Sequence, residues 1–410
     1  MLLSLALIFL LGLALAFVCK LIKLPSLLGF IAVGIVLGPY ALNLIDNSIL
    51  DISTELRQIA LIIILTRAGL SLDISDLKKI GRPAILMCFV PAVFEMIAVT
   101  ALGYFLFNIA IIEALIMGSV LAAVSPAVIV PRMLNMMEQN IGTKRGIPQL
   151  IMAGASVDDI FVIVLFATFT GIATGDGVSV MSIINIPLSI ILGAVVGIAI
   201  GILLVFLFKK IHIRDSIKVI ILLSISFLLI VLETAIKQWV GFSGLIAIMT
   251  IGITILTKYQ ALAKRLSNKF SKLWVAAEIL LFVLVGAAVD ITLIWDNIRL
   301  GLLLIFAALF VRMVGVWVCL IKTHFDKKEK LFCAISYTPK ATVQAAIGAI
   351  PLAIGIASGN LILSMAVLSI ILTAPIGAYL IDFTKNKLIS TDILEVDINE
   401  SNADIKQKID

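Results

Sequence analysis

The chain has 410 residues, of which 62% are hydrophobic and 14% are charged, and its mean hydropathy is +1.21. Soluble domains carry about 25% charged residues, so this composition excludes a soluble globular protein and predicts an all-α polytopic membrane protein. The four cysteines lie in apolar segments without the paired spacing of a zinc site or a disulfide framework, and we predict no bound cofactor.

Apolar stretches long enough to cross about 30 Å of hydrocarbon recur along the whole chain. The first has no basic residues before it and no cleavage site, so we interpret it as a span rather than as a signal peptide. In chain order the stretches predict about 13 transmembrane helices, at residues 2–19, 26–44, 57–72, 83–107, 112–136, 147–173, 181–208, 217–236, 240–257, 272–294, 298–321, 331–356 and 361–383.

The basic residues alternate between the loops that separate these spans. Most of the 31 lysines and arginines lie in one set of loops and in the C-terminal tail, whereas the other set contains only Arg57, Lys237 and Arg299. By the positive-inside rule, this places the N-terminus outside the cell membrane and the C-terminus in the cytoplasm. The net charge of +6 therefore reflects topology in a lipid bilayer, and we predict no nucleic-acid partner.

An internal repeat relates the two halves of the chain. AGLSLDIS at 68–75 resembles VGAAVDIT at 285–292, FEMIAV at 94–99 resembles VRMVGV at 311–316, and SPAVIVP at 125–131 resembles TPKATVQ at 338–344. The matched spans are separated by an odd number of crossings, so the two copies run through the membrane in opposite directions. We predict inverted six-helix repeats, namely residues 1–180 (spans 1–6) and 211–388 (spans 8–13), with span 7 at 181–210 as a linker and 389–410 as an acidic cytoplasmic tail.

Both copies contain a proline in the middle of a span. Pro126 follows Ser125 in the fifth span, and Pro339 follows Thr338 in the twelfth. Proline removes a backbone donor, and broken backbone within a bilayer is tolerated only where it is buried in protein or lines a wet cavity. The pattern predicts two discontinuous helices that meet near the middle of the membrane. The alternative is two proline kinks that only shape helix packing.

Two adjacent carboxylates, Asp158 and Asp159, lie in the otherwise apolar sixth span. An ionised carboxylate at the centre of a bilayer costs at least about 2.5–3.5 kcal/mol, and intramembrane acids are functional by default. Neighbouring residues on a helix point about 100° apart, so one can face a cavity while the other pairs with protein. A buried acid that titrates near neutral pH can exchange a proton for a cation. The alternative is a doublet neutralised by structural partners.

Three further charges lie at similar depth in the membrane. Glu95 and Arg312 occupy the same repeat position with opposite signs, so we predict a mainly structural ion pair that reversal of both charges would restore. Lys340 directly follows Pro339, and it either compensates the ends of the broken helices or pairs with Asp158. Neutral oxygens suited to a small hard cation are expected from Ser125, Ser156, Thr342 and Gln344.

Three segments in this order resemble the cation/proton antiporter superfamily: GSVLAAVSPAVIVPRML (118–134), GASVDDIFVIVLF (154–166) and YTPKATVQAAIGAIPL (337–352). They are most similar to its NHA-type sodium/proton exchangers of the electrogenic branch, and the resemblance covers spans 2–13. It implies two crossing discontinuous helices and a homodimer in which a core domain moves like an elevator against a dimerisation domain.

The resemblance also implies roles for individual residues. Asp159 matches the principal ion- and proton-binding carboxylate and Asp158 matches its partner, while Thr342, Ser125 and Pro339 lie on the crossing segments. The chain departs from some electrogenic relatives, which have a lysine on the span before the second crossover. Here that span contains Arg312, and an arginine does not release a proton.

These features predict a secondary active antiporter, and not an enzyme, that exchanges Na⁺ or Li⁺ for H⁺ at Asp159. A potassium/proton antiporter is the first alternative, because the same oxygens could serve either ion. A sodium-coupled symporter on a related fold is the second, but the small apolar residues of the crossing segments disfavour it. A channel is the third, and proton-competent acids in a repeated fold suit alternating access better than a continuous pore.

Overall fold

The computed structural model describes residues 1–22, 24–71, 81–176, 180–236 and 241–389. Residues 72–75 of the first repeat match, and the predicted acidic tail from residue 390 onward, lie outside this description. Within the described residues, nine helices are long and apolar enough to cross a membrane, and there are shorter apolar helices at Ser26–Leu37, Gly244–Lys258 and Thr342–Ala353.

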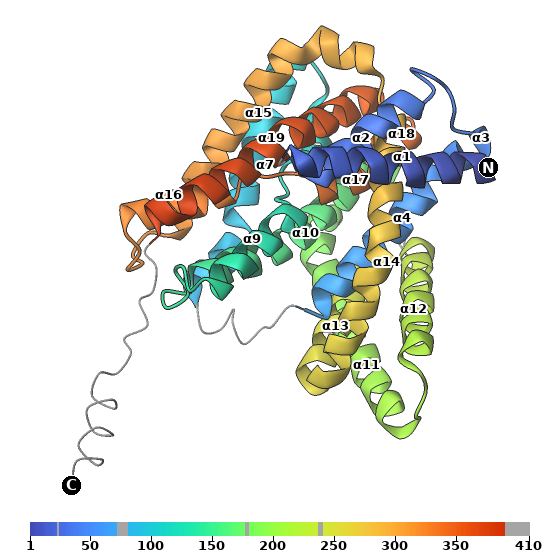
Figure 1. The fold of residues 1–410 in the computed structure, drawn as a ribbon, viewed down its shortest axis with the longest axis vertical. Coiled ribbons are helices and arrows are strands. Elements are labelled where there is room, and N and C mark those ends of the chain that lie inside the picture. The colour runs from blue at the N-terminus through green and yellow to red at the C-terminus, as the bar shows by residue number, and fades with distance from the viewer. Residues whose placement is uncertain (23, 72–80, 177–179, 237–240, 390–410) are drawn as a thin grey trace.

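The described chain is built from helices (Figure 1). In the first half they are α1 (Leu2–Leu21), α2 (Ser26–Leu37), α3 (Asn47–Leu50), α4 (Ser53–Gly69), α6 (Arg82–Met87), α7 (Val90–Phe107), α8 (Ile111–Leu121), α9 (Pro126–Glu138), α10 (Ile147–Gly171) and the π-helical turn η1 (Ile172–Asp176). In the second half they are α11 (Val180–Lys210), α12 (Asp215–Ile236), α13 (Gly244–Lys258), α14 (Gln260–Ala287), α15 (Ile291–Cys319), α16 (Lys327–Ser336), α17 (Thr342–Ile347), α18 (Ile350–Ala353) and α19 (Gly359–Leu388).

The described part of each predicted span contains helix, and two differences in length have local causes. The second span ends at Leu37 rather than at residue 44, because Gly38 is extended before Pro39, and a residue that precedes proline disfavours helix. The tenth span begins at Gln260 rather than at 272. Its first turns carry lysines and arginines, so hydropathy detects only the apolar part of a longer helix.

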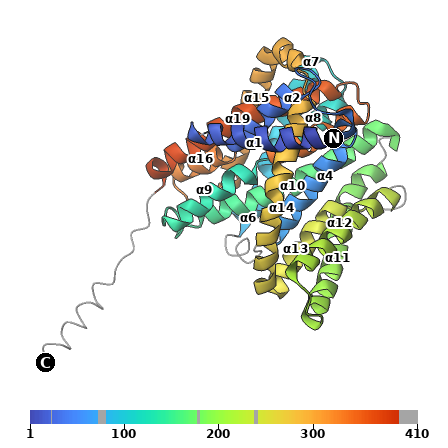
Figure 2. The same ribbon diagram turned by 45° about the vertical axis from the view of Figure 1, so that its right-hand side comes forward.

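The helices pack as two groups, which we name the scaffold group and the core group. The scaffold group contains α1, α2, α4 and α11–α14, and the core group contains α6–α10 and α15–α19. In Figure 1, α11–α13 of the scaffold group lie at the lower right and α9, α15 and α16 of the core group lie on the left and at the top, whereas α1 overlaps core-group helices in this view and in Figure 2. The main contacts between the groups are those of α17 with α4 and α14 and of α10 with α11.

The groups do not follow the order of the chain. Each takes helices from both predicted repeat units, so the two spatial groups do not coincide with the predicted units at 1–180 and 211–388. Close backbone packing holds the scaffold group together. A Cβ on Gly197 of α11 would lie 2.5 Å from the Ala247 carbonyl oxygen of α13, so only glycine permits this approach of the two helices.

Candidate ion-binding site

Two interrupted helices meet in the core group. The first interruption separates the end of α8 at Leu121 from the start of α9 at Pro126, and the second separates α16, ending at Ser336, from α17, starting at Thr342. The backbone N–H of Ser125 donates to the carbonyl of Pro339 over 2.8 Å, which joins the two interruptions directly. The predicted breaks at Pro126 and Pro339 are therefore present and in contact, whereas α9 continues through Pro131.

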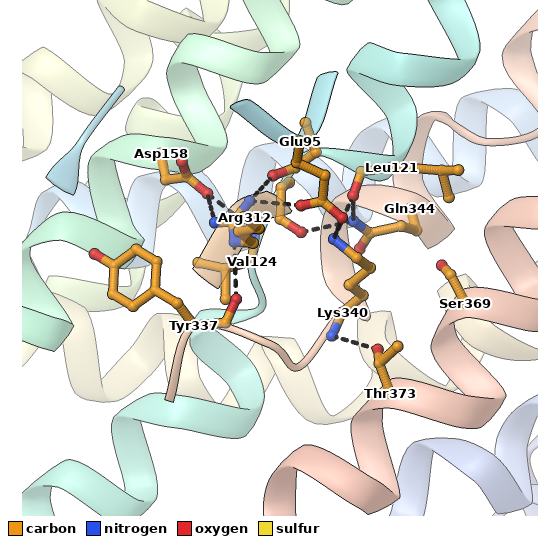
Figure 3. Close-up of polar contacts among 12 residues, drawn as sticks. Glu95, Leu121, Val124, Asp158, Arg312, Tyr337, Lys340, Gln344, Ser369 and Thr373 are labelled. Atoms are coloured by element: carbon orange, nitrogen blue, oxygen red, sulfur yellow. Dashed lines mark hydrogen bonds and ion pairs between the residues drawn. The ribbon is translucent and has the colours of Figure 1, made fainter. Parts of the chain in front are cut away.

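Carbonyl groups freed at the first break are capped by side chains from the second half of the chain (Figure 3). Lys340 Nζ donates to the Leu121 carbonyl over 2.6 Å, and Gln344 Nε2 donates to the Ala123 carbonyl over 2.8 Å. The Arg312 guanidinium donates to the carbonyl of Ala122. Because three successive carbonyls point at one side of the break, the three donors that reach them form a compact cap.

Further hydrogen bonds involve the second break and a backbone donor of the first. Arg312 Nε donates to the Tyr337 carbonyl over 2.8 Å, and the backbone N–H of Lys340 donates to Thr373 Oγ1 over 2.9 Å. The backbone N–H of Val124 donates to Asp158 Oδ2 over 3.1 Å. The crossing is thus held by hydrogen bonds that use backbone and side chain together, as a break buried in a membrane requires.

Four charged side chains form one continuous network at this crossing. Arg312 on α15 pairs with Glu95 on α7 and with Asp158 on α10, in both cases over 2.8 Å. Lys340 Nζ lies 2.6 Å from the second carboxylate oxygen of Glu95, an ion pair without aligned hydrogen-bond geometry. All four side chains are at most 2% exposed. The formal charges of the network sum to zero.

The Glu95–Arg312 ion pair that the sequence predicts is confirmed, but it is not isolated. Its arginine also holds Asp158, and its glutamate also holds Lys340. For Lys340 the structure favours compensation of a broken helix, since its ammonium group contacts the Leu121 carbonyl at the end of α8. The ion pair of Lys340 is with Glu95, so the alternative partner, Asp158, is not the one observed.

Asp159 differs from its neighbour in what surrounds it. It is 8% exposed, whereas Asp158 is fully buried against Arg312. Buried oxygens without a hydrogen-bond partner in the described chain include Asp159 Oδ1, Asp158 Oδ1, Ser125 Oγ and Thr342 Oγ1. Gln344 was expected to offer a neutral oxygen, and its Oε1 is also unpartnered while its amide nitrogen caps the first break. The side chain of Ser156 lies outside the description.

Two features of the site are not apparent from the sequence. Tyr337 places its carbonyl and its ring against Arg312, and the glycine at position 154 lies against the tyrosine hydroxyl. Both residues stand at the start of segments quoted for the family resemblance, 337–352 and 154–166, but neither is charged or a proline, so the sequence offers no reason to single them out. Thr373, on α19, is likewise recruited from outside the repeat matches.

Two crossing interrupted helices, placed beside a buried pair of acids in a membrane protein, define a secondary transporter of ions rather than an enzyme. The sequence profile of the family described as sodium/hydrogen exchanger, transmembrane, matches residues 5–384. The chain therefore belongs to the sodium/hydrogen exchanger family.

Individual relatives are similar over most of the chain. Human sodium/hydrogen exchanger 9B2 is 32% identical over 382 residues, which are 89% of this chain and 70% of the human protein. The mouse protein of the same name is 32% identical over 375 residues, 87% of this chain and 67% of its own length. The solved structure of the sodium proton antiporter MjNhaP1 from Methanocaldococcus jannaschii at pH 8 has the same fold. Its TM-score is 0.82 at 20% identity, and the match covers 94% of this chain and 97% of that one.

Proposed function

We propose that the protein exchanges sodium for protons across the cell membrane, with H⁺ and Na⁺ competing for Asp159. The main support for this proposal is the chemical type of the buried atoms at the crossing that lack a hydrogen-bond partner. The crossing leaves Asp159 Oδ1, Asp158 Oδ1, Ser125 Oγ and Thr342 Oγ1 without partners, and every one of them is an oxygen. Carboxylate and hydroxyl oxygens bind hard cations, so this set suits a dehydrated alkali ion such as Na⁺ or Li⁺.

The charge balance explains why Asp159 is assigned the exchange. Arg312 and Lys340 offset Glu95 and Asp158 by direct ion pairs, which leaves Asp159 as the extra carboxylate of the crossing. Its charge is neutralised either by a proton or by one Na⁺, and the two states exclude each other. Arg312 stays protonated and does not release a second proton, so this balance of charges supports the exchange of one proton for one sodium ion.

Alternating access is proposed to occur by an elevator-like movement of the core group against the scaffold group. The grouping supports it, because contacts within each group are extensive while those between the groups are concentrated at α17 with α4 and α14 and at α10 with α11. We also propose, on the family resemblance and on the distribution of basic residues, a homodimer in the cell membrane with the N-terminus outside and the C-terminus in the cytoplasm.

The test uses purified protein in vesicles with an imposed pH gradient that is followed by a pH-sensitive dye. Addition of Na⁺ dissipates the gradient in the wild type, and Asp159→Asn abolishes the response. Trials with Na⁺, Li⁺ and K⁺ in turn identify the ion, and a K⁺ response alone would favour the potassium/proton alternative. Sodium affinity that does not change between about pH 5 and pH 9 would refute competition at an acid.

A further inference from the structure

Arg312 is held by a third partner besides its two acids. The ring centroid of Tyr337 lies 5.5 Å from the guanidinium carbon, and the carbonyl of the same residue accepts a hydrogen bond from Nε over 2.8 Å. Both the ring and the carbonyl therefore face the guanidinium, one through the π-system and one through a backbone dipole. Figure 3 shows Asp158 and the ring of Tyr337 both beside Arg312, with Asp158 above the ring in this view.

The position of Tyr337 depends on a single small residue of α10. A Cβ at position 154 would overlap the tyrosine hydroxyl, and it would lie 3.2 Å from the ring carbon that bears this hydroxyl and 3.0 Å from Met87 Cβ. Tyr337 is fully buried, and its hydroxyl has no hydrogen-bond partner in the described chain. The hydroxyl therefore does not anchor the residue by a polar contact; the space above Gly154 accommodates it.

Gly154 lies one helical turn before Asp158, so the same face of α10 receives both the tyrosine and the arginine. The guanidinium is consequently enclosed by Asp158 on α10, by Glu95 on α7 and by the tyrosine at the end of α16. Loss of the tyrosine support would leave the acids in place and free the arginine to shift between them.

We propose that Tyr337 is a positioning residue that holds Arg312 against Asp158, and that Gly154 is required because only its missing side chain admits the tyrosine. This inference rests on the proposed exchange function. A guanidinium held next to the aspartate pair favours the ionised, cation-binding form of the acids. When the guanidinium is misplaced, protons compete better, so Na⁺ binding requires a higher pH and a higher sodium concentration.

The titratable and charged groups that face this contact come from every element packed around it. Tyr337 is approached by Asp158, by Cys88 after α6, and by Arg312 and Cys319 on α15. Arg312 pairs in addition with Glu95, whose other carboxylate oxygen contacts Lys340, and the charges of Lys340 and Arg312 are close enough to repel each other. The thiols are neutral near pH 7, so the response to pH is expected from the acids around Arg312.

The test measures sodium-driven exchange in vesicles as a function of pH and of sodium concentration. Gly154→Ala is expected to raise the half-maximal sodium concentration roughly tenfold, as the loss of one cation–π contact implies, and to move the pH profile to higher pH. Tyr337→Phe keeps the ring and the carbonyl and should match the wild type. Tyr337→Ala should reproduce the Gly154→Ala phenotype.

The decisive variant combines Gly154→Ala with Tyr337→Phe. Without the hydroxyl, the nearest ring atom to the new methyl group is 3.2 Å away, a contact that a small shift relieves, so the double variant should regain most of the sodium affinity. Gly301→Ala is the matched control, because its methyl group would meet only the ends of Leu368 and Met365. Thermal unfolding of each variant verifies that the protein is folded.

Three results would overturn the inference in an active wild type: wild-type exchange in Tyr337→Ala, damage by Tyr337→Phe as large as that by Tyr337→Ala, or no recovery in the double variant. If Gly154→Ala does not fold, the comparison of Tyr337→Phe with Tyr337→Ala still shows whether the ring of Tyr337 positions Arg312. A wild type that shows no cation-driven proton movement would instead refute the proposed function, and the positioning role would fall with it.

Discussion

The sequence repeat and the contacts in the structure make opposite predictions about a variant in which both charges of the Glu95–Arg312 pair are reversed. Pseudo-symmetry treats the two residues as an isolated pair, so Glu95→Arg combined with Arg312→Glu should restore what either single reversal loses. The structure shows further partners on each side. Glu95 also contacts Lys340 at 2.6 Å, and Arg312 also contacts Asp158 at 2.8 Å.

The magnitude follows from these contacts. In the double reversal an arginine at 95 would face Lys340, and a glutamate at 312 would face Asp158 and the carbonyls that the guanidinium now caps. Unit charges about 4 Å apart interact by about 4 kcal/mol at an effective dielectric constant of about 20, so each of two attractions becomes a repulsion of similar size. Removal of one partner of a buried pair costs about 3–5 kcal/mol. We expect the double reversal to be at least as destabilised as either single reversal.

The assay compares thermal unfolding and sodium-driven exchange for the wild type, both single reversals and the double reversal. We expect no recovery in the double variant. A matched comparison adds Lys340→Glu and Asp158→Lys to the double reversal, which returns an attractive partner to each site. Restoration of stability and exchange by the two reversals alone would show that the pair acts independently, and it would refute the network.

Other substitutions test separate parts of the fold. Lys340→Gln leaves the Glu95 carboxylate with one cation fewer, so we expect stability to fall by about 3–5 kcal/mol, seen as a lower midpoint of thermal unfolding; an unchanged midpoint would contradict this. Gly197→Leu forces α11 away from α13 and should lower the free energy of unfolding by about 1–3 kcal/mol. Ile198→Leu, on the exposed face of α11, is the control and should leave stability unchanged. Equal unfolding midpoints for the two variants would disprove the close packing. Arg145→Ala breaks a pair between the half-exposed Arg145 and the buried Glu329. Because the Glu329 carboxylate still accepts from the backbone N–H of Asp326, we expect a change in stability of about 1 kcal/mol in the same measurement.

Much of the fold could be predicted because lipid imposes strong constraints on composition. The spans follow from apolar length, and the breaks at Pro126 and Pro339 follow from chemistry that a membrane tolerates only inside protein. The Glu95–Arg312 contact follows from equal repeat positions. The helical extension before residue 272 could not be predicted from hydropathy, because its residues lie outside the apolar pattern while hydrogen bonding continues the helix.

The charged members of the site and the Glu95–Arg312 pair were predicted, but the other pairings were not. Opposite charges at the same depth allow several pairings, and only packing decides that Lys340 meets Glu95 while Arg312 meets Asp158. The hydrogen bonds that the backbone makes at the site could not be predicted from the sequence either. The N–H of Val124 is free to donate to Asp158 only because α8 ends before it. The spatial grouping of helices from both repeats depends in the same way on packing.

The hydrogen bonds at the crossing bear on how access to the site can alternate. Ser125 and Pro339 join the two interruptions, and Lys340 and Gln344 cap carbonyls of the first break from the second half of the chain. Separation of these segments within the membrane would leave several buried polar groups without partners, each at a cost of about 1–3 kcal/mol or more. Movement of the crossing as one body keeps all of them satisfied. The interface of α17 with α4 and α14 is instead formed by helices of separate groups, so it can change without breaking this set of bonds. The polar bonding of the crossing thus supports the proposed displacement of the whole core group rather than local rearrangement of either broken helix.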